Sequence, residues 1–598
     1  MAKVFARAAC GRSLLVLVAM LGAGYQEARA AGLDPHQVRA REMHNAALSV
    51  TWTPKIAFQP GTDIEELSRT IKWIRTNYPD LDIRAGGSRH SNSPVASTLG
   101  AYIHPEGIKF IERVKHGASA GVDLKSDAND AYLYRIGSGT TIREINAKLW
   151  SEKGALAALG GYDGQTLGGV LTTGTHGSVL ARGPLAEMVQ SIDLVTAEGA
   201  KIRMEPHDGL TDRTSFAKTH PGWRLIQADD YFDSALISMG TLGITHSYVV
   251  RARERFWMNE ARTTSMTRGN GQTKILRSDV VASLKNGNIY RMFLSHELLD
   301  GERPKGSMNF GGVFQGHPTS AFHMEFLWNP YDDRMLITSR NPVFGQKRVE
   351  FERKEPAEFE GIPNREMWRT FFTPAELNRP WFTELVTQKV FAMPVVKSVV
   401  VVIKNRVAKA IKGGPVAAID AVLDGLPDPV YFQRSYNVFN IGWAANSVPA
   451  QSADISVPLR GDKYLRAMEI LSQTAKNYAR DTNKYQTAPI SMRFVKGSRA
   501  ILGDPEDVCK FEILFSGDDQ ASRDLAKEMV TVYYRALEKE FGAEARFHWG
   551  QLIPQEVIAT YRKHIPASFP RYGAYKRVRD ELDPKRRLTN PWLGSLLP

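Results

Sequence analysis

A glycine-rich segment at residues 160–178 constrains the fold of this chain more than any other part of its sequence. It has the sequence GGYDGQTLGGVLTTGTHGS, in which seven of nineteen residues are glycine. Glycine lets a backbone turn at positive φ and approach a ligand closely, and runs of free N–H groups form concavities that bind anions. Hydroxyl donors are added by Thr166, Thr172, Thr173 and Thr175. We predict a site for a pyrophosphate-bearing cofactor, with ordinary tight turns as the alternative; the spacing is neither that of a P-loop nor G-x-G-x-x-G.

A second glycine turn occupies residues 84–91 (RAGGSRHS). It follows residues 82–85, which we predict as a strand, and it ends in a histidine. A lone histidine after glycines is more often a loop residue with satisfied hydrogen bonds than a functional group. His90 alone therefore does not indicate a site.

Two capping boxes predict helix starts in the same part of the chain. Residues 62–65 (TDIE) and 141–144 (TIRE) each place a threonine three positions before a glutamate, so that the hydroxyl and the carboxylate satisfy free N–H groups. Apolar residues follow at helical spacing: Ile64, Leu67, Ile71 and Ile74 after the first box, and Ile142, Ile145 and Leu149 after the second. With strands predicted at 82–85 and 132–136, the first third alternates between strands and helices.

The length of 598 residues exceeds what one hydrophobic core usually serves, so we expect at least two domains. The pattern changes near residues 250–260. Beyond it, residues 320–328 alternate as a half-buried strand does, and Leu525, Met529, Val532 and Ala536 predict a long helix that ends at Gly542. The last fifty residues are predicted to return to the first domain.

Composition excludes several classes of protein. Hydrophobic residues make up 43% and charged residues 24% of the chain, which excludes wholesale disorder and a polytopic membrane protein. The net charge of +13 favours acidic partners but is spread along the chain, and no nucleic-acid-binding module is recognisable. No cysteine and histidine spacing predicts a metal site. Cys509 is predicted to be a buried structural thiol.

The first thirty residues have the pattern of a cleavable export signal. Basic residues Lys3, Arg7 and Arg12 precede an apolar stretch at 13–24, and small residues at 28 and 30 suit signal peptidase. An uncleaved N-terminal anchor is the alternative. We therefore expect a periplasmic or secreted protein.

The order and spacing of the glycine segments, together with residues 238–244 (SMGTLGI), resemble the FAD domain of the vanillyl-alcohol-oxidase family, also called the PCMH-type FAD fold. The resemblance covers about residues 50–255. It is greatest to the sugar-lactone and alditol oxidases, a branch that includes gulonolactone and arabinonolactone oxidases and the covalent-FAD cholesterol oxidases. Motifs at 322–330 (FHMEFLWNP), 547–551 (FHWGQ) and 582–590 (LDPKRRLTN) resemble the same branch.

The resemblance implies an α+β fold, with a two-part FAD-binding domain followed by a larger substrate domain built on an antiparallel sheet. The implied divisions are an export signal at 1–30, an N-terminal extension at 31–49, the FAD domain at 50–255, the substrate domain at 256–545 and a C-terminal segment at 546–598 that returns to the flavin.

The resemblance also implies which residues hold FAD. His90 is at the position where the family links a histidine covalently to the flavin 8α-methyl group, although Arg89 stands where glycine is usual. The implied FAD-binding residues are Arg84, Ala85, Gly86, Gly87, Ser88, Arg89, His90, Ser91, Thr166, Gly168, Gly169, Thr173, Gly174, Thr175, His176, Gly177, Gly240, Gly243, Ile244 and Asn590.

For catalysis, the resemblance implies that a hydride passes from a substrate C–H bond to flavin N5. Relatives often carry a Glu-x-Arg pair on a strand; here Arg493 is present and Ser491 replaces the glutamate. Glu325 is our candidate for the missing acid. His548 is a candidate donor or base, and Gln551 stands where relatives often have a lysine. A structural role remains the alternative for Arg493, His176 and His548.

The substrate is left open by the sequence. We expect the alcohol group of a sugar lactone or polyol, with oxygen or another electron acceptor. A sterol or other hydrophobic alcohol is the alternative, because residues 395–412 combine an apolar run with basic residues, a pattern suited to an anionic membrane surface. A buried helix whose lysines point outward is the more common structure for such a segment. A basic secreted binding protein with a degenerate flavin fold is the alternative from another class.

Overall fold

The computed structural model describes residues 36–117, 121–263, 265–268, 271–285, 323–343, 345–355, 431–439, 450–486, 488–516 and 519–597. The predicted export signal and the basic segment at 395–412 lie outside these residues.

The first unit is a four-stranded sheet with one helix packed on it. Its strand order is β1-β4-β6-β5, with β4, β6 and β5 parallel. Its elements are β1 (Gln37–Val38), β4 (Ile56–Phe58), α2 (Ile64–Asn77), β5 (Ile83–Ala85) and β6 (Ala101–Ile103). The apolar residues Leu67, Ile71 and Ile74 of α2 are fully buried against this sheet, as their spacing predicts.

The predicted capping box at 62–65 is wrong, although the helix does begin at Ile64. Asp63, not Thr62, is the N-cap of α2, and its carboxylate accepts a hydrogen bond from the Glu65 N–H at 3.0 Å. The carbonyl of Thr62 is bonded instead to the His246 ring at 2.9 Å, which holds that residue outside the helix. The box at 141–144 is confirmed: Thr141 and Glu144 bond reciprocally at the start of α3.

The second unit is a six-stranded sheet in the order β12-β11-β10-β13-β8-β7. Its strands are β7 (Ile111–Arg113), β8 (Leu133–Gly137), β10 (Val189–Val195), β11 (Lys201–Glu205), β12 (Arg224–Gln227) and β13 (Ile244–Arg251). The helices of this unit are α3 (Ile142–Ser151), α4 (Leu167–Thr173), α5 (Arg213–Thr219) and α6 (Asp229–Leu236). Helix α4 is short because Thr166 caps its start and Gly174, at φ 81°, ends it.

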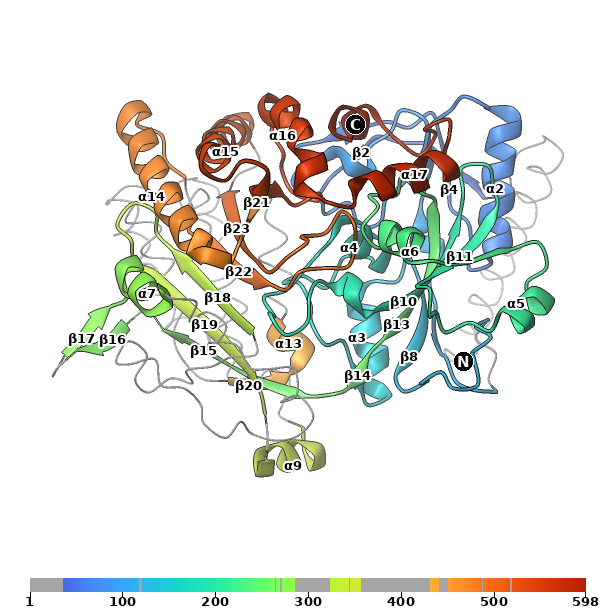
Figure 1. Ribbon diagram of the computed structural model, residues 1–598, viewed down its shortest axis with the longest axis horizontal. Helices are drawn as coiled ribbons and strands as arrows, with labels where there is room; N and C mark the ends of the chain where they lie inside the picture. The colour runs from blue at the N-terminus through green and yellow to red at the C-terminus, as the bar shows by residue number, and fades with distance from the viewer. Residues whose placement is uncertain are drawn as a thin grey trace, which may run out of the picture.

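The third unit is an eight-stranded sheet in the order β20-β15-β19-β18-β22-β23-β21-β24, antiparallel throughout. Its strands are β15 (Trp257–Thr263), β18 (His323–Trp328), β19 (Met335–Pro342), β20 (Tyr431–Arg434), β21 (Ala450–Pro458), β22 (Ile490–Val495), β23 (Val508–Ser516) and β24 (Arg546–Phe547). Helices α14 (Lys463–Thr482) and α15 (Gln520–Phe541) lie over one face (Figure 1). The predicted helix is confirmed as α15, which ends at Gly542.

The two faces of this sheet differ sharply. On the helix side, Phe326, Met492 and Phe511 are essentially inaccessible to solvent, and Cys509 is buried among them as predicted. Because neighbouring residues of a strand point to opposite faces, the intervening positions form a second face, which carries Glu325, Arg493 and other charged side chains. This polar face borders the first two units.

The C-terminal segment crosses back to the first two units (Figure 1). It contains α16 (Gln555–Ser568), α17 (Tyr572–Leu582) and α18 (Pro591–Leu596). The Asn590 side chain donates to the carbonyls of Pro94 and Ser97, both at 2.9 Å, and also caps α18. The chain end is thereby fastened to the first unit.

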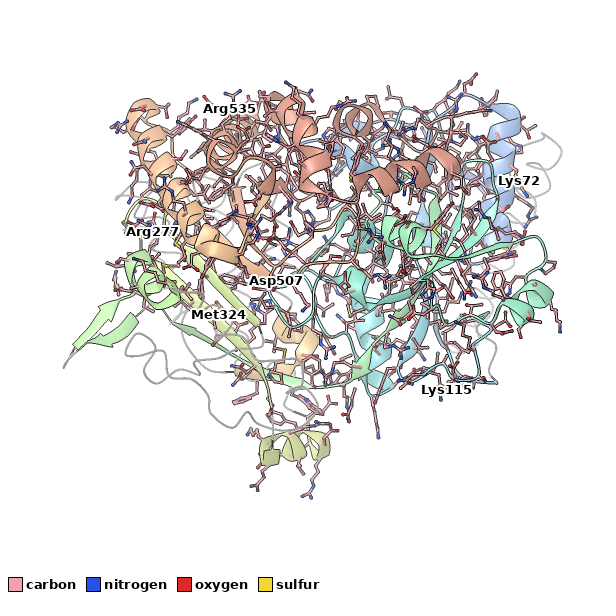
Figure 2. The ribbon with its side chains drawn as sticks, in the orientation of Figure 1. Lys72, Lys115, Arg277, Met324, Asp507 and Arg535 are labelled. Carbon is pink, nitrogen blue, oxygen red and sulfur yellow. The ribbon has the colours of Figure 1, made fainter. Side chains whose placement is uncertain are left out.

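Smaller elements complete the described chain: β2 (Met43–His44), β3 (Thr51–Trp52), β9 (Gly154–Ala155), β14 (Arg253–Glu254), β16 (Ser265–Arg268), β17 (Gly271–Lys274), α7 (Arg277–Leu284), α9 (Gly345–Arg353) and α13 (Ser435–Phe439). Lys72 and Arg535 are exposed at the periphery, whereas Met324 lies inside the protein (Figure 2). Within the described ranges, no helix is both long enough and apolar enough to cross a membrane.

Candidate active site

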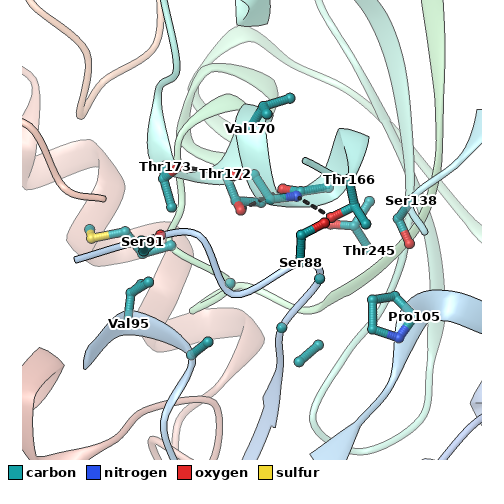
Figure 3. A pocket seen from close by; sticks show the side chains of 18 of the residues that line it. Ser88, Ser91, Val95, Pro105, Ser138, Thr166, Val170, Thr172, Thr173 and Thr245 are labelled. Atoms are coloured by element: carbon teal, nitrogen blue, oxygen red, sulfur yellow. Dashed lines mark hydrogen bonds between the residues drawn. The ribbon is translucent and has the colours of Figure 1, made fainter. Parts of the chain in front are cut away.

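A cleft between the four-stranded and six-stranded sheets brings the glycine segments together. It contains about 850 Å³ of space between protein atoms, including its open mouth. One wall is the turn at 84–91, and the opposite wall is helix α4 with the residues that precede it (Figure 3). We call this the cofactor cleft.

The walls of the cofactor cleft approach each other so closely that side chains are excluded. A Cβ atom built on Gly87 would lie 1.8 Å from the Thr166 hydroxyl oxygen, and one built on Gly86 would lie 2.4 Å from the Tyr102 hydroxyl oxygen. Glycine is therefore required at both positions.

The cleft also offers polar groups that have no protein partner. The hydroxyl of Ser138, which lines the cleft, is buried and has no hydrogen-bond partner among the described residues. Backbone bared by glycine beside such a donor is what a large phosphate-bearing cofactor requires. The residues present thus fit a dinucleotide.

Arg84 holds the floor of the cleft together. Its guanidinium donates to four backbone carbonyls, those of Val95, Met239, Gly240 and Leu588, at 2.6–3.2 Å. Burial lowers the pKa of Arg84 to about 10, so it stays charged at neutral pH. This cation joins the glycine turn, the segment before β13 and the C-terminal segment, and it adds positive charge to the cleft.

His90 lies at the end of the glycine turn and lines the cleft. Its ring centre is 4.8 Å from that of Tyr162, and burial lowers the pKa of His90, so the imidazole is neutral at neutral pH. Arg89 has φ 55°, in the left-handed region that favours glycine. Glycine, the residue that the resemblance implies at position 89, would adopt this conformation without strain.

Most of the predicted FAD-binding residues line the cleft. Those that do are Arg84, Ala85, Gly86, Gly87, Ser88, Arg89, His90, Ser91, Thr166, Gly168, Gly169, Thr173, Gly240, Gly243 and Ile244. The cleft lining does not include Gly174, Thr175, His176, Gly177 or Asn590. The first four follow α4 and turn towards the eight-stranded sheet, and the Asn590 side chain is used in the bonds described above.

His176 connects the cleft to the polar face of the sheet. Its Nε2 lies 3.0 Å from the Asp454 carboxylate on β21, and its ring centre is 5.5 Å from that of His548. Burial alone would raise the pKa of Asp454, but Lys510, His176 and His548 hold it below its usual range. Two residues further on, the Ser178 hydroxyl donates to the Met324 carbonyl and accepts from the Phe494 N–H. The segment after α4 is therefore docked directly on β18, β21 and β22.

His548 and Gln551 lie on the opposite side of this junction. Burial lowers the pKa of His548 to about 4, and its Nδ1 accepts from the Gly550 N–H at 3.1 Å. The Gln551 side chain accepts from the Asn92 side chain at 2.9 Å. Gln551 thereby joins the segment after β24 to the segment that follows His90, whereas His548 lies against His176. No direct contact between either of them and Arg493 is found in the described residues.

The polar face carries a carboxylate–arginine–carboxylate triad. Arg493 on β22 is 3.0 Å from Glu325 of β18 and 3.0 Å from Glu512 of β23, both measured from its Nη2. Ser491 donates to Glu325 at 3.0 Å. Solvent reaches the triad, because its side chains are partly exposed: 10% for Glu325, 16% for Arg493 and 18% for Glu512. We call Glu325, Ser491, Arg493, Glu512 and Asp454 the charged wall.

A second arginine extends the charged wall towards β15. Arg340 on β19 donates to Glu260 at 2.6 Å, to His323 at 2.8 Å and to Glu325 at 3.4 Å. Burial would raise the pKa of Glu325, but Arg493 and Arg340 hold it well below its usual range. Glu325 is therefore ionised, and its oxygens are occupied by protein donors.

Glu512 and Asp454 were missed by the sequence analysis. On β23, Lys510 and Glu512 alternate with the buried Cys509, Phe511 and Ile513, so period-two alternation was available as a signal. This alternation places Glu512 on a polar face of the strand, but it does not identify Arg493 as the partner of Glu512. In the described part of the chain, no cluster of three or more histidine, cysteine or acidic side chains could hold a metal ion.

Two protein families match the chain. An FAD-binding domain matches residues 54–205, and the D-arabinono-1,4-lactone oxidase family matches residues 309–596. Among curated proteins, the chain is 24% identical to L-gulonolactone oxidase from Bos taurus over 225 residues, which are 38% of this chain and 43% of that enzyme. It is 25% identical to alditol oxidase from a Streptomyces species over 222 residues, 37% of this chain and 44% of that enzyme. The matches thus span less than half of these relatives.

Solved structures share the fold over nearly the whole chain. Cholesterol oxidase from B. sterolicum aligns with a TM-score of 0.61 at 14% identity, covering 94% of this chain and 98% of that one. A VAO-type flavoprotein from Myceliophthora thermophila C1 aligns with a TM-score of 0.53 at 12% identity, covering 90% and 78%. An FAD-binding domain occupies residues 54–205, so FAD is the cofactor. The chain shares its fold with cholesterol oxidase and a VAO-type flavoprotein, which confirms the predicted fold class. The predicted resemblance to sugar-lactone and alditol oxidases is confirmed, because residues 309–596 match the D-arabinono-1,4-lactone oxidase family and the chain is similar to alditol oxidase.

Proposed function

We propose that the protein oxidises a CH–OH group of a polyhydroxylated substrate, a sugar lactone or a polyol, with oxygen or another acceptor taking up the electrons. The observation that carries this proposal is the charged wall. Carboxylates and an arginine that solvent can reach are suited to hydrogen-bonding several hydroxyl groups at once. His176, in the segment that follows the cleft-lining helix α4, bonds to Asp454 of the wall.

FAD, when bound, supplies the acceptor for the hydride that leaves the substrate carbon. The residues of the chain do the remaining work. The glycine segments and Ser138 hold the dinucleotide, and Arg84 adds positive charge near it. Arg493 stabilises negative charge that develops on the substrate oxygen. Glu325 keeps Arg493 in place through two hydrogen bonds to its guanidinium.

We also propose that His90 forms a covalent bond to the flavin. In support, His90 lines the cleft, and its neutral imidazole has the lone pair that such a bond requires. Acid-precipitated protein should retain its yellow colour, and His90→Ala should release it. Colour that stays with the precipitated His90→Ala protein would contradict the link.

A hydrophobic alcohol is the second candidate substrate. A long-chain alcohol oxidase from an uncultured marine euryarchaeote is 26% identical over 212 residues, 36% of this chain and 37% of that enzyme. The charged wall argues against it, because an apolar chain on this face would strip water from Arg493 and its carboxylates without replacing their hydrogen bonds.

A substrate panel tests the proposal. Purified holoenzyme is assayed with sorbitol, L-gulono-1,4-lactone, cholesterol and a long-chain alcohol, using both oxygen and an artificial acceptor. Turnover confined to sorbitol or the lactone is expected. Turnover confined to cholesterol or the long-chain alcohol would overturn the proposal in favour of the second candidate.

We further propose that the protein is exported, on the basis of the basic and apolar pattern of its first thirty residues. N-terminal sequencing of the mature protein should begin near residue 31. A mature chain that retains Lys3 and Arg7 would contradict cleavage.

A further inference from the structure

The charged wall contains two carboxylates beside Arg493, and the protein holds them differently. Glu325 accepts from Ser491 at 3.0 Å, from Arg493 at 3.0–3.1 Å and from Arg340 at 3.4 Å. Glu512 accepts from Arg493 at 3.0 Å through one oxygen. Its other oxygen receives one long hydrogen bond, from Ser452 at 3.5 Å. Glu512 can therefore accept a further hydrogen bond, whereas the oxygens of Glu325 are already occupied.

The charged groups that shift the pKa of Glu512 lie on the neighbouring strands of the sheet and on the segment after α4. Burial raises the pKa of Glu512, Arg493 lowers it, and Asp454 and Glu325 raise it further, with His176 as a weaker opposing influence. The net shift is upward, whereas the pKa of Glu325 is shifted downward. Two neighbouring carboxyl groups whose pKa values are pushed apart are the usual arrangement for separate acid–base and electrostatic roles.

The position of Glu512 also matches the replacement at residue 491. Ser491 on β22 and Glu512 on β23 are direct cross-strand partners, and such partners have Cβ atoms about 4.5–5.5 Å apart on the same face. A carboxylate on either strand can therefore reach Arg493. Glu512 on β23 and Arg493 on β22 thus place a carboxylate beside a guanidinium across two strands.

We propose that Glu512 binds the reacting hydroxyl of the substrate and accepts its proton. This inference depends on the proposed function. The C–H bond breaks with its electron pair and the hydride leaves to bound FAD. The O–H bond breaks towards Glu512, and the carbon and oxygen are left as a carbonyl. The alcohol thus loses two electrons and two protons, and oxygen, as the acceptor of the proposed function, takes up both to form hydrogen peroxide, with the proton from Glu512 among them.

The test uses Glu512→Gln, which keeps the shape of the side chain, and the double variant Ser491→Glu/Glu512→Gln, which moves the carboxylate back to β22. Glu469→Gln, at an exposed position on α14, is the control. Turnover of sorbitol and L-gulono-1,4-lactone is measured as a function of pH. In parallel, infrared spectroscopy follows the titration of buried carboxyl groups, which needs no turnover.

We expect Glu512→Gln to lower kcat by about 10²–10⁴-fold, the range for losing a general base. The acid limb of the pH profile should disappear together with the carboxyl band that titrates above the ordinary glutamate range. The kcat of the double variant should be at least about tenfold higher than that of Glu512→Gln. The kcat of Glu469→Gln should match that of the wild type.

Two results would overturn the inference, and they are distinguishable. In the first, the wild type oxidises sorbitol or the lactone and Glu512→Gln does so at the same rate, with the same pH profile and carboxyl band. Glu512 is then not the base, and the proposed function still holds. Absence of turnover on either substrate by yellow wild-type holoenzyme overturns the proposed function and the role of Glu512 with it.

Discussion

The cofactor cleft and the charged wall are built in different ways. Backbone bared by glycine forms much of the cleft, and most of its residues come from three short segments, at 84–91, 165–173 and 239–245. The wall is formed by single side chains from β18, β21, β22 and β23, which are separated by long stretches of chain and meet only through strand register. A site made of backbone is visible in local sequence, whereas a site made of cross-strand side chains depends on how the strands pair.

Among the changes that compare the cleft with the wall, the largest effect is expected from removing the centre of the charged wall. Arg493→Ala should lower kcat by about 10²–10³-fold, because a donor that stabilises developing negative charge is lost. It should also cost about 3–5 kcal/mol of folding free energy, since Glu325 and Glu512 are left without their shared cation. Activity per bound flavin and urea denaturation measure the two effects.

The exposed Arg466 on α14 provides the control, and Arg466→Ala should change neither quantity appreciably. Flavin content of Arg493→Ala should stay near that of the wild type, because Arg493 is not part of the cofactor cleft lining. Wild-type turnover by Arg493→Ala would remove the wall from the active site.

The next effect tests the cleft instead of the wall. Gly87→Ala places a Cβ where the Thr166 side chain now lies, so the two glycine segments must separate. We expect flavin affinity to fall at least about tenfold, or 1.4 kcal/mol. The ratio of flavin absorbance to protein absorbance in the purified sample measures it.

Gly594→Ala is the matched substitution, because a Cβ at that position on α18 meets no atom within 4 Å. It should retain full flavin content. Full flavin content in Gly87→Ala would mean that close approach of the two segments is not needed for binding.

The sequence predicted the cleft better than the wall for a physical reason. Glycine at 86 and 87 and the capping box at 141–144 depend on a few neighbouring residues, so they are visible locally. Arg493 was found through resemblance. Glu512 was missed because its role depends on pairing between β22 and β23, and Asp454 because its partner His176 is 278 residues away in the chain.

The contact between the two regions is tested by Asp454→Asn. His176 would lose a charged acceptor, at a cost of about 1–3 kcal/mol. Because the pKa of Asp454 is lower in the folded protein than its ordinary value of 3.8, its contribution is fully present above about pH 4 and is lost as pH falls towards the folded pKa. Urea denaturation at pH 3, 5 and 7 should show a difference between wild type and variant that shrinks at pH 3. A difference that is constant over this range would exclude the charge of Asp454 as its source.

The smallest effect is expected from Thr141→Ala, which should weaken the cleft and leave the charged wall unchanged. The Thr141 hydroxyl caps α3, and the Thr141 backbone forms a β-bridge with Thr166, so the start of the helix lies against the segment that lines the cleft. Thr141→Ala should cost about 1 kcal/mol, as loss of an N-cap usually does. Thr214→Ala, at an exposed position on α5, should cost less. Since the cap does not contact the charged wall, turnover per bound flavin should stay unchanged. Flavin retention on dilution, compared in the His90→Ala background where no covalent bond holds the flavin, should fall. A fall in turnover per bound flavin would show that the two regions are coupled through α3 as well as through His176.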